Sequence, residues 1–240
     1  MTKLIDTHFH LDMYKNHKEI FAYLNKKKIY TLCMTNSPGV FISCNQLYSE
    51  GKYVRFAIGF HPLNFRLTDK DLDDFFWLLP SVDYVGEIGL DFSNKKCLPK
   101  EQQMIYFERI VERCAVLNKL MSIHVRKAEA EVIKILEKHM PRRVIIHWFS
   151  GSKSELKMFL KLGCYFSINA NMVLSNLEVV KQIPKDKILI ESDGPYSRVN
   201  GIKYKPELLG DEYEIISDKL NEPELTSIVF GNFKRLLMIK

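Results

Sequence analysis

The chain has 240 residues, 46% of them hydrophobic, and a formal net charge of +6. This length allows a buried core in one α/β barrel or in two small domains, and the mild basic excess suits a partner that carries phosphates. The five scattered cysteines form no C-x-x-C motif, which argues against a disulfide scaffold or a zinc finger and indicates a reducing cytoplasm. We expect no signal peptide, because only Leu4-Ile5 separate Met1-Thr2-Lys3 from the next charge, and no membrane association, because no apolar stretch approaches the roughly 18 residues of a membrane span.

Short apolar runs alternate with longer amphipathic stretches along the chain, and we interpret the short runs as strands. In chain order these predicted strands are Leu4–His8, Ile29–Met34, Val54–Ile58, Tyr84–Gly86, Met121–His124, Val144–His147, Tyr165–Ile168 and Ile188–Glu191. The clearest predicted helices between them are Lys100–Lys119, Lys127–Met140 and Ser152–Leu162. Pro99 precedes the first of these helices and Gly163 follows the last, which are positions that each residue favours.

Strands that alternate with helices predict a parallel sheet, because parallel strands need crossover connections. Eight such repeats at this length fit a (β/α)8 TIM barrel. An open doubly wound sheet is the alternative, but it usually has a glycine-rich phosphate loop after the first strand, and Asp6-Thr7-His8 is not one. No Gly/Ser/Pro-rich linker divides the chain, so we expect residues 1–240 to form a single domain.

Side chains that can bind metal ions, histidines and carboxylates, recur where the predicted strands end. His8 and His10 are two residues apart, so in a strand both point to the same side. The carboxyl ends of barrel strands surround one mouth, where catalytic residues gather. The other segments that reach this mouth are Gly59-Phe60-His61-Pro62, Gly86-Glu87-Ile88-Gly89-Leu90-Asp91, His124, His147 and Glu191-Ser192-Asp193.

Imidazole and carboxylate together favour zinc, manganese or iron, whereas carboxylate and water alone suit magnesium. Six protein ligands are too many for one tetrahedral zinc, which indicates two divalent ions, Mg²⁺, Mn²⁺ or Zn²⁺. The six candidate ligands are His8, His10, Glu87, His124, His147 and Asp193.

Each candidate ligand also has a plain structural alternative. His124 and His147 could be core histidines, and Asp193 could be a turn residue before Gly194-Pro195. Glu87 is harder to explain in that way, because a carboxylate in an apolar strand is costly unless it is paired or bound to a metal. We expect Glu87 and Asp193 to be the catalytic carboxylates, with Asp193 taking the proton of the attacking water.

Two further residues are candidates for binding a substrate phosphate. Arg126 lies two residues past His124, on the same side if the strand continues, and its alternative role is a surface salt bridge. His61 could hydrogen-bond a phosphate oxygen or cap a loop. Asp91 could hold a ligand histidine in place.

Six segments taken together resemble the TatD family of metal-dependent deoxyribonucleases. They are Asp6-Thr7-His8-Phe9-His10-Leu11-Asp12, Gly59-Phe60-His61-Pro62, Gly86-Glu87-Ile88-Gly89-Leu90-Asp91, Ile123-His124-Val125-Arg126, His147-Trp148-Phe149-Ser150-Gly151 and Glu191-Ser192-Asp193-Gly194-Pro195-Tyr196. The resemblance implies an amidohydrolase-like (β/α)8 barrel, two divalent ions and hydrolysis of nucleic-acid phosphodiesters, often from a 3′ end.

The resemblance also implies a division of ligands, in which His8, His10 and Asp193 hold one ion, His124 and His147 hold the other, and Glu87 bridges them. The basic stretch that usually follows Tyr196 in the family is missing here, which leaves substrate preference open. The segment around Trp148 is similar to the TatD-like component of Qat-type anti-phage defence systems, which would imply protein partners in a defence operon.

Two other functions stay open at this point. A hydrolase on the same barrel could act on a lactone, cyclic amide or nucleoside, but many of those use a carboxylated lysine where this chain has Glu87. A non-enzymatic subunit could bind nucleic acid or a partner protein, but such a subunit should have lost ligands, and all six are present.

Overall fold

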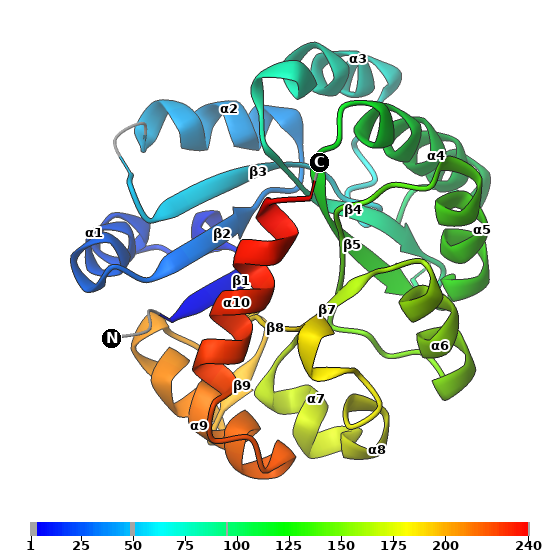
Figure 1. The fold of residues 1–240 in the computed structure, drawn as a ribbon. Helices are drawn as coiled ribbons and strands as arrows, with labels where there is room; N and C mark the ends of the chain where they lie inside the picture. Colours follow the sequence, from blue (N-terminus) through cyan, green and yellow to red (C-terminus); the bar gives the residue numbers. More distant parts are fainter. Residues whose placement is uncertain (1–3, 49–50, 95, 240) are drawn as a thin grey trace.

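The computed structural model describes residues 4–48, 51–94 and 96–239, and its centre is a barrel of eight parallel strands in sequence order (Figure 1). The strands are β1 (Ile5–Phe9), β2 (Tyr30–Met34), β3 (Val54–Phe60), β4 (Tyr84–Asp91), β5 (Leu120–Arg126), β6 (Val144–His147), β7 (Tyr165–Ile168) and β8 (Ile188–Ile190). Neighbouring strands from β1 to β8 pair in parallel, which confirms the predicted (β/α)8 barrel.

Helices between the strands form the outer layer of the barrel (Figure 1). They are α1 (His17–Lys27), α2 (Pro38–Leu47), α3 (Asp69–Leu78), α4 (Lys100–Val116), α5 (Glu129–His139), α6 (Lys153–Lys161), α7 (Ala170–Ser175) and α8 (Leu177–Val180). After β8 the chain forms a small hairpin and two more helices: β9 (Arg198–Val199), β10 (Ile202–Lys203), α9 (Leu209–Leu220) and α10 (Leu225–Leu237). Within the described ranges, none of these helices combines the length and apolar character needed to cross a membrane.

Local sequence explains where several helices begin. The Thr68 side chain accepts from the backbone of Asp71, and Asp71 returns the bond, so a capping box starts α3. Ser152 and Glu155 form the same box at α6. The predicted helix 152–162 is therefore confirmed, with Ser152 as its cap rather than its first residue.

The strands are almost completely buried, as expected for a parallel sheet covered by helices. β4 runs to Asp91, five residues beyond the predicted end at Gly86, so Glu87 lies inside a strand. The predicted helix 127–140 begins later, at Glu129, because Lys127 has a left-handed backbone with φ of 54°.

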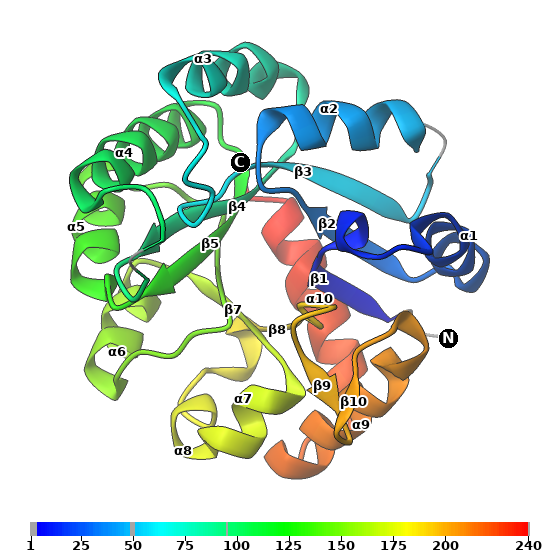
Figure 2. The ribbon, with the colours of Figure 1, turned by 180° about the vertical axis from the view of Figure 1, so that it is seen from behind.

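One end of the barrel is closed by α10, which lies across it in Figure 1 and behind it in Figure 2. The Asn232 side-chain amide donates to the carbonyls of Lys185 and Ile188, at the start of β8, over 2.7 and 2.8 Å. Phe233 packs against Tyr30, at the start of β2. The amino ends of the strands are thus covered, and their carboxyl ends form the mouth.

Candidate metal centre

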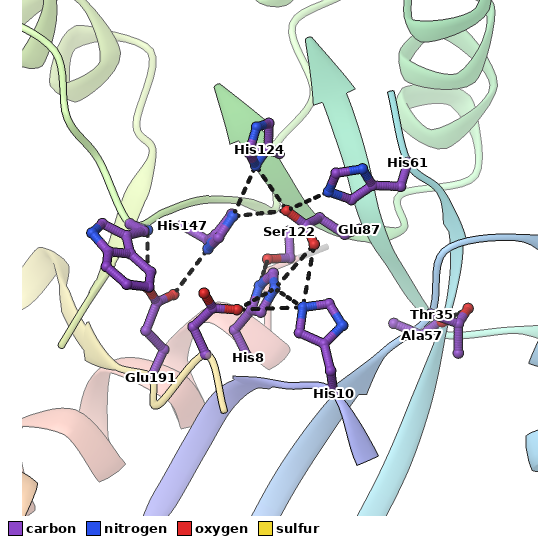
Figure 3. A network of polar contacts seen from close by, with 12 residues as sticks. His8, His10, Thr35, Ala57, His61, Glu87, Ser122, His124, His147 and Glu191 are labelled. Carbon is purple, nitrogen blue, oxygen red and sulfur yellow. Dashed lines mark hydrogen bonds and ion pairs between the residues drawn. The ribbon is translucent and has the colours of Figure 1, made fainter. Parts of the chain in front are cut away.

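The predicted ligand residues converge at the carboxyl ends of the strands (Figure 3). His8 lies in β1 and His10 directly after it, while Glu87 comes from β4. His124 lies in β5 and His147 is the last residue of β6. The remaining ligand candidate, Asp193, lies in the turn after β8.

Glu87 stands in the middle of this cluster and directs its two oxygens to different histidines. Its Oε2 lies 3.4 Å from Nε2 of both His8 and His10. Its Oε1 lies 2.9 Å from His124 Nδ1 and 2.9 Å from His147 Nε2. Only 3% of Glu87 is exposed, so this carboxylate serves the cluster rather than solvent.

On one side of Glu87 lie His8, His10 and Asp193, which we call the inner half. The Nε2 atoms of His8 and His10 are 3.2 Å apart. Asp193 Oδ1 lies 3.3 Å from His10 Nε2 and 3.7 Å from His8 Nε2. All three residues are buried, and their ligand atoms lie within 4.8 Å of one another, close enough to hold one ion.

On the other side of Glu87 lie His124 and His147, which we call the outer half. His124 Nδ1 and His147 Nε2 are 3.3 Å apart. The opposite nitrogen of each ring faces a carboxylate, with Asp91 Oδ2 at 3.0 Å from His124 Nε2 and Glu191 Oε2 at 3.5 Å from His147 Nδ1. The predicted contact between Asp91 and a candidate ligand histidine is therefore confirmed.

The role of Glu191 was missed in the sequence, where only Asp193 was singled out in that segment. Glu191 is fully buried and accepts from the Trp148 backbone N–H at 3.0 Å and from the Asn169 side-chain amide at 3.1 Å. The Ser167 hydroxyl also donates to it. A carboxylate at the end of an apolar strand was the available signal, but its partners come from other strands.

His61 reaches the same cluster, with its Nε2 3.1 Å from Glu87 Oε1. Its Nδ1 accepts the backbone N–H of Leu63 at 3.1 Å. In a neutral imidazole the other nitrogen then carries the proton, so Nε2 is a donor. This tautomer suits a hydrogen bond to an anionic oxygen better than metal ligation.

Arg126 is the last residue of β5, so the strand does continue past His124 as the prediction required. It is exposed and lies beside Asp91 in the β4–β5 register. Its guanidinium makes no hydrogen bond or ion pair with the described part of the chain. It is therefore free to contact an anion at the mouth.

The histidines and carboxylates strongly perturb one another. Burial would raise the pKa of Glu87, but the surrounding histidines outweigh burial and hold this pKa well below its usual range. Burial would lower the pKa of His10, but Asp193 and Glu87 outweigh it and raise the pKa to about 10. Burial lowers the pKa of His8. The arrangement favours cations among its buried oxygens, which is the chemistry of a metal site.

Two non-glycine residues of the cluster have a left-handed backbone, Trp148 with φ of 37° and Asp193 with φ of 47°. Such conformations are costly and persist where neighbouring contacts hold them. The Trp148 N–H donates to Glu191, and the Asp193 N–H donates to the His8 carbonyl at 2.9 Å. These bonds fix the chain directly after His147 and at Asp193.

Comparisons with known proteins agree with this picture. The sequence model of a family described as TatD related DNase matches residues 5–238. The Bacillus subtilis protein YabD, named as an uncharacterized metal-dependent hydrolase, is 27% identical over an alignment of 261 positions, gaps included, which covers 98% of this chain and 99% of that protein. The human 3′-5′ RNA nuclease TATDN2 is 30% identical over an alignment of 216 positions, gaps included, which covers 80% of this chain and 28% of that protein.

The fold has a close counterpart among solved structures. The crystal structure of YJJV, a TatD homologue from Escherichia coli K12, has a TM-score of 0.88 at 21% identity, and the match covers 100% of this chain and 99% of that one. At this identity the likeness bears on the fold alone, and the family match carries the functional inference.

Proposed function

Because the chain belongs to the TatD family of metal-dependent hydrolases, we propose that it is a nuclease that cleaves DNA phosphodiester bonds through two divalent ions. The observation that carries this proposal is the division of the Glu87 carboxylate between two sets of histidines. One carboxylate with a separate donor set at each oxygen suits a bridge between two ions. The donor chemistry, imidazole with carboxylate, fits Mn²⁺ or Zn²⁺ and accommodates Mg²⁺ through the oxygens.

In this proposal each half of the cluster holds one ion. The inner ion is held by His8, His10 and Asp193, the outer ion by His124 and His147, and both by Glu87. When bound, two such ions stabilise the attacking and leaving oxygens of a displacement and make the attacking water more acidic.

Asp193 is the proposed general base. Its Oδ1 is near His8 and His10, but 10% of its side chain is exposed, whereas the His8 side chain is fully buried. It is therefore the inner residue best placed to meet a water at the mouth. A carboxylate there can take the proton of this water as it attacks phosphorus.

His61 and Arg126 are the proposed phosphate ligands. The His61 Nε2–H already points at the Glu87 carboxylate and can donate to a phosphate oxygen near it. The Arg126 guanidinium, which has no hydrogen-bond or ion-pair partner among the described residues, can bind a phosphate with two parallel hydrogen bonds.

DNA is the first candidate substrate because the matching family is described as TatD related DNase. RNA is the second candidate because the human relative is named as an RNA nuclease, and the same name supports cleavage in the 3′ to 5′ direction. A role in anti-phage defence, with partner proteins from the same operon, is proposed only from the sequence around Trp148.

The test is a cleavage assay on single-stranded DNA, duplex DNA and RNA with Mg²⁺, Mn²⁺ or Zn²⁺ added. With a 5′ label, a 3′ exonuclease gives a ladder that shortens one nucleotide at a time, whereas an endonuclease gives internal fragments. The controls are the chelated protein and Glu87→Ala. Failure to cleave any of the three substrates with any of these metals would overturn the proposal.

A separate count of bound metal tests the two halves. His8→Ala should lose mainly the inner ion and His124→Ala mainly the outer one, so each variant should retain about one ion per chain. His139→Ala, which changes a histidine at the end of α5, is the matched control and should keep both. If the wild-type protein takes up no divalent ion under any condition, the two-metal centre is wrong.

A further inference from the structure

The barrel closes between β1 and β8 differently from its other strand pairs. Each of the other neighbouring pairs is joined by a ladder of backbone hydrogen bonds, but in the described residues β1 and β8 have no such ladder. The Thr7 hydroxyl donates to the Ile190 carbonyl over 2.9 Å instead. Side-chain bonds and a few separate backbone bonds therefore hold this seam together.

The buried carboxylate of Asp6 makes the largest set of these seam contacts. Its Oδ1 accepts the backbone N–H of Ser192 across the seam at 3.0 Å and, within β1, the backbone N–H of His8 at 3.2 Å. Its Oδ2 accepts the Ser192 hydroxyl at 2.6 Å. Asp6 is only 2% exposed, so solvent cannot replace these bonds. One side chain thus ties β1 to the residue before Asp193.

The inner half of the metal centre lies across this same seam. His8 and His10 belong to the β1 side and Asp193 belongs to the β8 side. Two backbone bonds continue the contact, from Asp193 N–H to the His8 carbonyl and from His10 N–H to the Gly194 carbonyl, both 2.9 Å. The distance between Asp193 and the two histidines therefore depends on how the seam is held.

We propose that Asp6 is a positioning residue that fixes the Asp193 turn against β1 and thereby sets the geometry of the inner half. The three hydrogen bonds of the Asp6 carboxylate go to backbone N–H groups and to the Ser192 hydroxyl, none to a candidate ligand side chain. Asp6 acts through Ser192, whose hydroxyl also accepts the N–H of Gly194 at 3.2 Å and so orders the turn on both sides of Asp193. The proposal rests on the proposed function only in requiring that the inner half binds a metal.

Thr7 provides a matched control for a merely stabilising role. It is fully buried, lies next to Asp6 on β1 and makes a hydrogen bond across the same seam. Thr7→Val removes that bond with almost no change of shape and leaves the Asp193 turn untouched. A loss that comes only from a weaker seam should appear in both Thr7→Val and Asp6→Ala.

The experiment titrates Mn²⁺ into the wild-type chain and its variants and follows free Mn²⁺ by electron paramagnetic resonance, beside thermal unfolding and steady-state kinetics. Asp6→Ala should weaken one of the two sites by roughly 10- to 100-fold and lower kcat more than it changes KM. Thr7→Val should leave both Mn²⁺ affinities unchanged, even where it lowers the unfolding temperature.

Asp6→Asn is the conservative variant and should recover most of the affinity. The amide oxygen can still accept the two backbone N–H groups, and the amide nitrogen can donate to the Ser192 hydroxyl, which also has acceptor capacity. Should Asp6→Ala fail to fold, Ser192→Ala removes only the bond to Oδ2, and it should weaken the same site by a smaller factor.

The inference is overturned if Asp6→Ala, or Ser192→Ala in its place, binds both ions with wild-type affinity. It is also overturned if Thr7→Val weakens the same site as much as Asp6→Ala does. A wild-type chain that binds two Mn²⁺ ions but cleaves no nucleic acid overturns the nuclease alone. A wild-type chain that binds no Mn²⁺ overturns both.

Discussion

The inner and outer halves of the candidate metal centre both contain imidazole and carboxylate groups, but they hold their histidines differently. In the outer half, each ring has a carboxylate behind it, Asp91 for His124 and Glu191 for His147. In the inner half, His8 Nδ1 has only the Ser122 hydroxyl at 3.0 Å. Neither His10 Nδ1 nor His147 Nδ1 has a hydrogen-bond partner among the described residues, but His147 Nδ1 faces the Glu191 carboxylate at 3.5 Å.

The difference follows from where the ligands come from. His8 and His10 are two residues apart on one chain segment, so the backbone of β1 already sets their spacing and direction. His124 and His147 come from separate strands, β5 and β6, and each ring can turn independently. A carboxylate behind a ligand histidine fixes its tautomer and orientation. Backbone geometry therefore places the two histidines of the inner half, and side-chain pairs place the two histidines of the outer half.

Glu87→Ala should have the largest effect, because the Glu87 carboxylate contacts the histidines of both halves. Its loss leaves His8 and His10 without Oε2, and His124 and His147 without Oε1, so we expect both ions to bind weakly and cleavage to fall to the level of the chelated protein. Elemental analysis after gel filtration measures the metal. Retention of two tightly bound ions would remove Glu87 from its bridging role.

Asp193→Asn should have the next largest effect, confined to the inner half. Asparagine keeps the shape and one oxygen that can ligate, but it is far less basic than a carboxylate. The variant should keep its fold and at least one ion and lose roughly 10²–10⁴-fold in kcat, which is the usual contribution of a general base.

Single-turnover rates on the metal-saturated Asp193→Asn variant separate proton transfer from metal loss. Near-full turnover would show that the proton goes to solvent or to another group at the mouth. A loss of rate that disappears at high metal concentration would assign Asp193 to ligation alone.

Arg126→Ala tests the exposed residue that lies two positions past His124 of the outer half. If the guanidinium grips the substrate phosphate, kcat/KM should fall by roughly 10- to 100-fold, the value of a charge-assisted hydrogen bond, while metal content stays the same. Lys127→Ala is the matched control, since it removes the next positive charge, which is also exposed. If the two variants lower kcat/KM equally and only slightly, Arg126 acts through the general positive charge of the protein surface and does not bind the phosphate directly.

The sequence was informative where a residue acts through its own strand. The runs Val144–His147 and Tyr165–Ile168 were predicted with the bounds that the structure has, because buried parallel strands are continuously apolar. The shared direction of His8 and His10 needed only the period of a strand. The place of Glu87 inside β4 was harder to predict, since a carboxylate between glycines resembles the end of a strand.

The sequence was uninformative where a residue acts through a distant partner. Asp6 and Ser192 are 186 positions apart, and nothing local pairs them. The same holds for the contact between Glu191 and His147. It holds also for α10, which covers the amino ends of the strands through the hydrogen bond from Asn232 to Ile188 at the start of β8. These features follow from barrel closure, which only the complete fold determines.

The smallest predicted effects test the comparison of the two halves most directly. They come from changing Asp91 and Ser122, which hydrogen-bond the ring nitrogens of His124 and His8 that point away from Glu87. Asp91 accepts from the Ser93 N–H with Oδ1 and faces His124 Nε2 with Oδ2, so both of its oxygens serve donors. Asp91→Asn has one oxygen for two N–H groups, and we expect the outer ion to bind roughly 10- to 100-fold more weakly.

Ser122→Ala removes a neutral hydroxyl from behind His8, a ring that the β1 backbone already places. Loss of one neutral hydrogen bond, about 1 kcal/mol, should weaken the inner ion by only about fivefold. Mn²⁺ titration of the two variants measures both affinities on one scale. If Ser122→Ala weakens its ion as much as Asp91→Asn does, the inner rings depend on side-chain support as well, and backbone placement by β1 is not sufficient to organise the inner half.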